Sequence, residues 1–370
     1  MSISFWAADL PNARTVFASF LKDLLSRQVV DAVYVPLRTA GGGIAPALVR
    51  RPDLLDDADP LAPVMLINGA RAVSALTMGA APERIAAVLR PCEIRALIEL
   101  VKLKQASLEH LTIIGLDCAG TYEVGDYARL AQAGGDPALR LLAEAAQGHI
   151  AAQDGYALRP ACRMCEHPVS GNAQITVGFI GVDGLMIEVD EATAQKLEPS
   201  WPRIPAGDLA FRQDIVQRLA AERAEQRDRA MAAFAQQVNS PAALAAYFDT
   251  CQRCHNCMVA CPICYCKECL FRTPAMDHDA ARYLRLADRK GAARLPADTV
   301  LFHLTRLNHM STSCVGCGLC ESACPSDIPL TILFRTVAAQ TQALFDYTPG
   351  RRLDDEIPLM TFREAELEGT

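Results

Sequence analysis

The sequence predicts an α/β domain in its first two hundred residues and a mostly helical, cysteine-rich domain after it. Three observations support this division. Residues 85–118 show a buried-strand, an amphipathic-helix and a buried-strand pattern in turn, which is typical of a parallel βαβ unit. Residues 211–238 are charged and alanine-rich at helical spacing, as expected of a long, partly exposed helix. Most of the fifteen cysteines then lie between residues 251 and 324.

The individual elements follow from hydrophobic periodicity. The first domain is expected to contain a helix then a strand over 15–36, strands at 62–67, 85–90, 111–118, 173–181 and 184–189, and a helix at 93–106. In the second domain a helix begins after Ser240, which can cap it, and Pro241 suits its first turn. Further helices are expected at 279–290 and 297–312. The predicted domains are 1–205, a helical linker at 206–240, a cysteine-rich domain at 241–345 and a tail at 346–370.

Composition narrows the class of protein. The chain has 370 residues, is 51% hydrophobic and has a formal net charge of -7, which disfavours nucleic acid and anionic membranes as partners. No run of eighteen apolar residues is present, so we expect no membrane span. The first residues lack the basic start and apolar run of a signal peptide. The clustered cysteines therefore indicate metal ligation in the cytoplasm rather than extracellular disulfides.

Two segments share the spacing C-x2-C-x2-C-x3-C followed by proline. This is the bacterial ferredoxin motif, in which three close thiolates bind one [4Fe–4S] cluster and the fourth binds the neighbouring cluster. A structural zinc domain would instead place its four ligands in CxxC pairs. The motif assigns one cluster to Cys251, Cys254, Cys257 and Cys324. It assigns the other to Cys314, Cys317, Cys320 and Cys261.

The remaining cysteines leave alternatives open. Cys264, Cys266 and Cys269 are either buried, ligand-free side chains near a cluster, or ligands of an extra metal or an alternative fourth ligand. Cys257, Cys261 and Cys264 also match the C-x3-C-x2-C radical-SAM spacing, but no repeated βα pattern surrounds them.

Four further cysteines lie in the first domain, and two of them follow predicted strands. The carboxyl ends of parallel strands meet at one edge of a sheet, so Cys92 and Cys118 are expected to lie together there. The CxxC loop of Cys162 and Cys165 would fold over them. Spacing alone allows a third [4Fe–4S] cluster, a zinc site or free thiols. The four are Cys92, Cys118, Cys162 and Cys165.

These motifs carry a resemblance to a known family. "LRPCEIRALIELVKL", "LTIIGLDCAGT", "ACRMCEH" and "ITVGFIG" resemble, in order, the flavin domain of the beta subunits of deazaflavin-dependent hydrogenases and formate dehydrogenases. The resemblance covers roughly residues 30–190. It implies an α/β flavin domain that binds FAD and a third [4Fe–4S] cluster, ligated by Cys92, Cys118, Cys162 and Cys165. The long helical spacer of the ferredoxin-like domain resembles those of succinate dehydrogenase and heterodisulfide reductase subunits.

Two groups of residues are candidates for contacts with the flavin. Gly41, Gly42 and Gly43 could approach a flavin phosphate or form a plain turn, and Asn68 and Arg71 follow the strand expected at 62–67. No G-x-G-x-x-G dinucleotide turn is present. Two residues depart from the family pattern: Glu93 replaces a glutamine and Gln174 an acidic residue. Both departures bear on which hydride carrier is used, a nicotinamide or a deazaflavin.

The sequence thus predicts an electron-transfer subunit of a cytoplasmic oxidoreductase. Electrons would pass between a hydride carrier, FAD, the [4Fe–4S] clusters and a partner, which the resemblance implies is a formate dehydrogenase, a hydrogenase or a heterodisulfide-reductase-like protein. The tail would help to dock that partner. Two alternatives are a flavin-free electron wire or assembly adaptor, and a stand-alone iron–sulfur flavoenzyme that reduces a small molecule.

Overall fold

A seven-stranded mixed sheet organises the first half of the chain in this computed structural model, which describes residues 2–79, 83–197, 202–266, 268–276, 279–291 and 297–358. The strand order is β1-β7-β6-β5-β4-β2-β3. The pairs β2–β4, β4–β5 and β5–β6 are parallel, and the outer pairs are antiparallel. The strands are β1 (Ser2–Ala8), β2 (Ala32–Arg38), β3 (Ile44–Val49), β4 (Ile85–Leu89), β5 (Leu111–Leu116), β6 (Ile175–Gly178) and β7 (Leu185–Asp190).

Helices cover the sheet and form nearly all regular structure after it. In the first half they are α1 (Ala13–Ser26), α2 (Gly69–Thr77), α3 (Pro91–Lys102), α4 (Val124–Gln132), α5 (Pro137–Ala146), α6 (Pro160–Arg163) and α7 (Glu191–Leu197). After the long α8 (Ala206–Gln237) come α9 (Pro241–Tyr247), α10 (Asn256–Ala260), α11 (Ala280–Lys290), α12 (Ala297–Met310), α13 (Leu319–Ser322) and α14 (Leu330–Leu344). Short 3-10 helices lie at Leu10–Asn12, Pro52–Asp57 and Leu270–Arg272. The expected α/β domain followed by a helical domain is confirmed.

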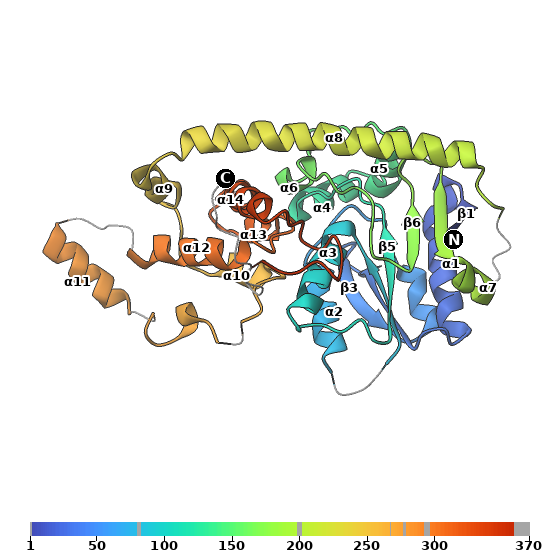
Figure 1. Cartoon of the computed structure of the whole chain (residues 1–370), viewed down its shortest axis with the longest axis horizontal. Coiled ribbons are helices and arrows are strands. Elements are labelled where there is room, and N and C mark those ends of the chain that lie inside the picture. The colour runs from blue at the N-terminus through green and yellow to red at the C-terminus, as the bar shows by residue number, and fades with distance from the viewer. Residues whose placement is uncertain are drawn as a thin grey trace.

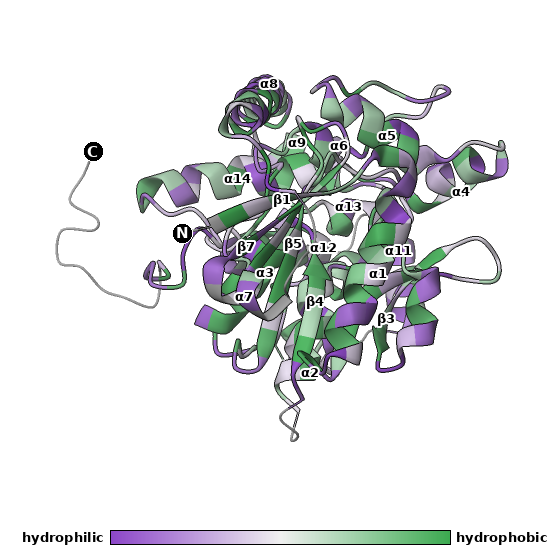
Figure 2. Cartoon of the chain, turned by 90° about the vertical axis from the view of Figure 1, so that its right-hand side faces the viewer, coloured by the Kyte–Doolittle hydropathy of each residue, from purple (hydrophilic) through white to green (hydrophobic). Residues whose placement is uncertain are grey.

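Alternating side chains divide the strands between two cores. Val33, Val88 and Ile114 point to the face covered by α1, α5 and α8. Tyr34 and Ile113, with their neighbours of the same parity, point to the face covered by α2 and α3. The hydrophobic colour of β4 and β5 in Figure 2 reflects burial on both faces. The second core continues without a break into the cysteine-rich part, so the two halves share one interior.

Helix α8 spans the molecule and joins its two halves (Figure 1). Ile215 and Leu219 pack into the core beside the sheet, and Phe234 packs against Tyr247 of α9. The sequence suggests that the charges of this helix form only a solvated face, and that interpretation is wrong for three arginines. They pair with groups around the strand ends: Arg212 with Asp117, Arg223 with the carbonyl of Ala119, and Arg227 with Glu166.

Several strand predictions differ from the structure. β1 and β3 are not foreseen, and the strand expected at 62–67 is wrong, because only Val64 forms a single bridge there. Pro63 interrupts this buried segment, and its carbonyls bond elsewhere. Arg90 Nη2 donates to Ala62 O at 2.5 Å, and Tyr122 N donates to Pro63 O at 2.8 Å. The strand was predicted from apolar content alone. In the structure the backbone carbonyls of this segment accept hydrogen bonds from a side chain and a loop instead of from a neighbouring strand.

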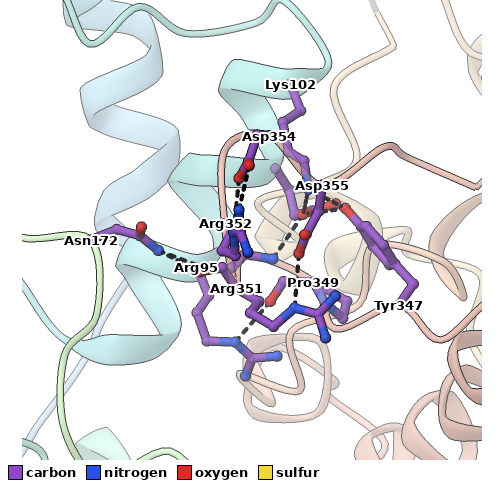
Figure 3. A network of polar contacts seen from close by, with 11 residues as sticks. Arg95, Lys102, Asn172, Tyr347, Pro349, Arg351, Arg352, Asp354 and Asp355 are labelled. Atoms are coloured by element: carbon purple, nitrogen blue, oxygen red, sulfur yellow. Dashed lines mark hydrogen bonds and ion pairs between the residues drawn. The ribbon is translucent and has the colours of Figure 1, made fainter.

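The first part of the tail packs against α3 as a C-terminal strap, residues 347–358 (Figure 3). Glu99 is fully buried, and its Oε1 accepts from Tyr347 Oη at 2.6 Å and from Gly350 N at 2.8 Å. Arg95 Nε donates to Pro349 O at 2.9 Å. Residues 359–370 lie outside the described residues, and the docking role expected of the tail stays a prediction.

The cap of α9 gives a first stability prediction. Ser240 Oγ accepts from Ala243 N at 3.2 Å, as the sequence indicates. Ser240→Ala removes that acceptor and should cost about 1 kcal/mol. The thermal unfolding midpoint should fall by roughly 2–4 °C, measured by circular dichroism. Ser240→Asp keeps a capping oxygen and should preserve the midpoint. An equal fall in both variants would contradict the role of the cap.

Candidate metal centres

The first-domain cysteines form one group, which we call the sheet-edge set: Cys92, Cys118, Cys162 and Cys165. Cys92 is the second residue of α3, directly after β4, and Cys118 follows β5. Burial raises the pKa of the Cys92 thiol well above its usual range, and nearby charge at Cys118 and Cys165 adds to the rise. Burial also raises the pKa of Cys118 to about 11, against the opposing charge of Arg90, with Cys162 and Cys165 contributing. The four thiols are therefore near enough to affect one another, and their ligation of one cluster stays a prediction.

Cys162 is held in an environment that favours its thiolate. Burial alone would raise its pKa, but the charge of Arg159 and hydrogen bonds from Thr121 outweigh burial and lower it. Arg159 Nη2 lies 3.7 Å from the Cys162 sulfur, and Thr121 N donates to it at 3.4 Å. A metal ligand must be the thiolate, so this side chain is already prepared for that role.

The first ferredoxin set comprises Cys251, Cys254, Cys257 and Cys324. Burial raises the pKa of Cys257 to about 11, Arg306 opposes the rise, and charge at Cys251, Cys254 and Cys324 adds to it. Cys324 thus lies near Cys257 in the structure, and the ligation of one cluster by these four cysteines stays a prediction.

A histidine borders this set. His303 Nε2 lies 3.5 Å from the Cys251 sulfur, and its ring stacks on Phe248 at a centroid distance of 4.0 Å. Burial, with the charge of Arg306, lowers the pKa of His303 to about 3. The imidazole is therefore neutral near pH 7 and can donate one hydrogen bond to the sulfur, which tunes a cluster potential.

The second ferredoxin set comprises Cys261, Cys314, Cys317 and Cys320. All four line one partly open cavity between α12, α13 and α14. Burial raises the pKa of Cys317 to about 12, with Cys261 and Cys314 adding to the rise. Cys261 is therefore separated from Cys257 and joins the later motif. This separation does not favour a radical-SAM site, which would need both in one set.

The sheet-edge set and the second ferredoxin set are direct neighbours. Charge at Cys317 contributes to the raised pKa of Cys92, after burial and Glu93. Gly318, beside Cys317, packs so closely on α6 that an added Cβ would lie 2.3 Å from Ala161 Cβ. Arg95 Nη1 also donates to Val315 O at 3.3 Å, tying α3 to the second ferredoxin loop. The three sets thus follow one another in space, from the sheet-edge set through the second ferredoxin set to the first ferredoxin set.

Buried arginines suit anionic clusters at these positions. Arg306 is 4% exposed, and its Nε and Nη1 have no hydrogen-bond partner. Burial acts to lower the pKa of Arg306, but the thiols of Cys257, Cys261 and Cys320 outweigh it and raise the pKa. Four thiolates around an iron–sulfur core carry net negative charge, which such a guanidinium would offset. The donor set and the charges therefore fit [4Fe–4S] clusters.

A site for a single metal ion needs a different arrangement of ligands from a [4Fe–4S] cluster. Within the described ranges, no group of three or more His, Cys, Asp or Glu is arranged to hold one metal ion. The ligands of one zinc ion surround a common centre at about 2.3 Å. In a [4Fe–4S] cube each thiolate binds its own iron, so its ligands lie farther apart.

A second cavity, which we call the Arg90 cavity, opens beside the sheet-edge set. Its walls come from the strand ends of β2, β4 and β5, the buried loop before α2, and Arg90 and Glu93. Arg90 is buried, and its Nε has no hydrogen-bond partner. The apolar walls and the free donor suit a planar cofactor such as a flavin ring.

The sequence-based flavin candidates do not line the Arg90 cavity. Gly41, Gly42 and Gly43 form the β2–β3 turn, where Thr39 N donates to Gly43 O at 2.8 Å. Asn68 is buried and caps α2, accepting from Ala70 N at 3.0 Å. Arg71 lines a different cavity and donates to Val259 O. Sequence analysis missed Arg90, although its position between β4 and Cys92 was a usable signal.

The two departures from the family pattern have structural roles. Glu93 Oε2 accepts from Arg90 N at 2.8 Å, and its Oε1 accepts from Gly69 N at 2.7 Å. Gln174 Oε1 accepts from Ile113 N at 2.8 Å. Both side chains therefore support the backbone around the strands.

The chain is similar to known proteins. Residues 247–328 match the family model of the 4Fe-4S dicluster domain. The beta subunit of F420-dependent formate dehydrogenase from Methanocaldococcus jannaschii is 26% identical over 315 residues, 75% of this chain and 76% of that protein. The beta subunit of F420-dependent formate dehydrogenase 1 from Methanococcus maripaludis is 24% identical over 328 residues, 74% of each chain. This chain is a homologue of F420-dependent formate dehydrogenase beta subunits.

The resemblance inferred from the first-domain motifs is thereby confirmed, and the chain is an electron-transfer subunit of an oxidoreductase with a 4Fe–4S domain. A solved chain of the F420-reducing [NiFe] hydrogenase complex of Methanosarcina barkeri matches with a TM-score of 0.44 and 12% identity, over 65% of this chain and 92% of that one. No helix among the described residues combines the length and apolar character needed to cross a membrane.

Close packing of the second ferredoxin loop gives a second prediction. Gly318 has φ +75°, and Gly318→Ala adds a clash with Ala161 to the strain of that backbone. Gly291→Ala is the matched control, because Gly291 has φ +70° and no atom within 4 Å of an added Cβ. The Gly318 variant should lose about 1–3 kcal/mol more than the control in thermal unfolding. Equal losses would show that the loop can move away from α6 freely.

Proposed function

We propose that this chain carries electrons between a hydride carrier and a partner oxidoreductase through FAD in the Arg90 cavity and three [4Fe–4S] clusters. One observation supports this most strongly. The sheet-edge set lies between the Arg90 cavity and the second ferredoxin set, with Cys92 close to Cys317 and Glu93 of the same helix turn lining the cavity. A flavin cavity, a metal-ligand set and a dicluster domain in that order make a continuous electron path.

The chain's residues have distinct tasks in this proposal. Cys92, Cys118, Cys162 and Cys165 would hold the first cluster, and the two ferredoxin sets the others. A bound flavin supplies the conversion between hydride and single-electron transfer. Arg90 would donate to it from the cavity wall, and Glu93 would hold the Arg90 backbone in place. The surrounding apolar residues would limit the access of water to the bound ring.

The carrier and the partner follow from the relatives. Both are named F420-dependent formate dehydrogenase subunits, so we propose a deazaflavin as carrier and a formate dehydrogenase catalytic subunit as partner. Nicotinamide is the competing carrier. The C-terminal strap and the long α8 are the elements proposed to support docking.

The test begins with the purified anaerobic chain. Iron, sulfide, zinc and flavin are quantified per polypeptide, and at least about 12 iron atoms with about one FAD are expected, because the twelve assigned ligands alone would hold three four-iron clusters. Reduced F420 and NADH are then mixed with the protein in separate stopped-flow experiments. Bleaching of flavin followed by cluster reduction with reduced F420, and not with NADH, would support the proposed carrier.

Other outcomes are equally informative. About 8 iron atoms without flavin would overturn the flavin converter and favour a flavin-free electron wire. Reduction by NADH alone would overturn the deazaflavin assignment. Turnover of a small-molecule acceptor by the isolated chain, without any partner, would favour a stand-alone flavoenzyme.

A further inference from the structure

The three cysteines outside the sets described above share one cavity. Cys264, Cys266 and Cys269, which we call the pocket cysteines, line a solvent-open cavity of about 1120 Å³ between α10, α12 and the 3-10 helix Leu270–Arg272. The three thiols therefore converge on one space.

Sulfur is dense around this cavity. Met258 and Met310 also line it. The Cys269 sulfur lies 3.6 Å from Met258 Sδ, and the Cys261 sulfur lies 3.8 Å from Met310 Sδ. Soft sulfur side chains of this kind surround soft metal centres rather than hard cations.

A buried cation with free donors faces the same space. Arg306 lines both this cavity and the second ferredoxin cavity. Its Nη2 donates to Cys257 O at 3.1 Å, whereas its buried Nε and Nη1 have no hydrogen-bond partner. Arg71 and Arg272 add positive charge to the lining, which Glu268 offsets only in part. Unsatisfied, buried guanidinium donors are costly, so the site is suited to an anionic occupant.

We propose that the pocket cysteines ligate a further iron–sulfur cluster in this cavity. Three thiolates can hold a three-iron cluster, or a four-iron cluster whose fourth iron faces the cavity. Either core with three thiolates is an anionic, sulfur-rich group, which matches the lining and the free donors of Arg306. The proposal uses none of the twelve cysteines assigned above, and it rests on the proposed function only in that neighbouring sets carry clusters.

The site is placed for exchange with a partner. Cys266 is exposed, and the apolar side chains of Val259 and Leu270 in the lining are 46% and 56% exposed. Arg306 and Cys261 connect the cavity to the second ferredoxin set. A cluster here would lie at the surface, beside the second ferredoxin set and close to Arg71 of α2.

Iron counting tests the proposal. The chain and the variant Cys264→Ser/Cys266→Ser/Cys269→Ser are reconstituted anaerobically with ferrous iron and sulfide. The unaltered chain should bind about 3–4 more iron atoms than the variant, and both should give the same signals of reduced ferredoxin clusters in low-temperature EPR. An extra EPR signal in the oxidised chain would identify a three-iron cluster, and its absence a four-iron one.

Equal iron contents would overturn the proposal. Cys92→Ser serves as the matched control, because it should lose the sheet-edge cluster and keep the cluster in the pocket. If the sheet-edge cluster does not form in the unaltered chain, only the proposed function is contradicted. The pocket cluster is tested separately, by the difference in iron content between the unaltered chain and the triple variant.

Thiol labelling gives a second test that needs no variant. In the reconstituted chain, Cys266 should resist iodoacetamide until an iron chelator is added, with labelling read by mass spectrometry. Immediate labelling would show a free thiol, and labelling only after a disulfide reductant would show a disulfide. Either of these two results would overturn the cluster.

Discussion

Cys92→Ser is expected to stop electrons passing between the hydride carrier and the ferredoxin clusters. Burial raises the pKa of the Cys92 thiol, and a serine hydroxyl in the same buried position would ionise still less readily. The sheet-edge cluster then loses a ligand at the only proposed link between the Arg90 cavity and the second ferredoxin set. The rate of ferredoxin-cluster reduction by reduced F420 should fall at least about 100-fold in stopped-flow measurements.

Two controls separate a broken path from a damaged protein. Dithionite reduces exposed clusters directly, so it should still reduce the ferredoxin clusters of the Cys92 variant. Cys266→Ser removes an exposed thiol that is not among the twelve proposed ligands of the path, and it should leave carrier-driven reduction of the ferredoxin clusters unchanged. Normal carrier-driven reduction in the Cys92 variant would show that electrons bypass the sheet-edge set.

The fold was predictable where periodicity was strong. The β4–α3–β5 unit follows from its apolar strands and amphipathic helix, and the structure pairs β4 with β5 in parallel. β1 was missed because a short edge strand depends on its partner: Ser2–Ala8 pairs with β7, which lies far away in sequence. The segment at 62–67 was misjudged because its backbone partners, Arg90 and Tyr122, are not neighbours in the sequence.

The sequence predicted which cysteines lie near one another in the candidate site, but it did not predict their surroundings. Duplicated cysteine spacing is enough to pair Cys324 with the first motif and Cys261 with the second. The ion pairs of α8 could not be predicted in this way, because Arg212 and Asp117 are far apart in the sequence and meet only when α8 packs against the sheet. Arg306 likewise has the helical spacing of an ordinary polar residue in α12, and only the structure shows it buried among thiols.

Asp117→Ala should have the largest effect on stability. Asp117 lies between β5 and Cys118 and has no exposed side-chain surface. Its carboxylate binds Arg212 of α8 at 2.6 and 2.9 Å and accepts from the backbone nitrogens of Phe179 and Ile180 at 3.0 Å. One side chain therefore joins the end of β5, the turn after β6, and the helix that connects both halves of the molecule.

Removing this carboxylate leaves Arg212 and two buried N–H groups without their acceptor. Loss of one partner of a buried ion pair costs about 3–5 kcal/mol. The thermal unfolding midpoint of the anaerobic protein should fall by roughly 6–20 °C. Asp354→Ala is the control, since the Arg352–Asp354 pair is exposed, at 63% and 68%, and its loss should change the midpoint by no more than about 1 °C. Equal, small shifts in both variants would mean that α8 is held by its apolar contacts alone, through Ile215 and Leu219.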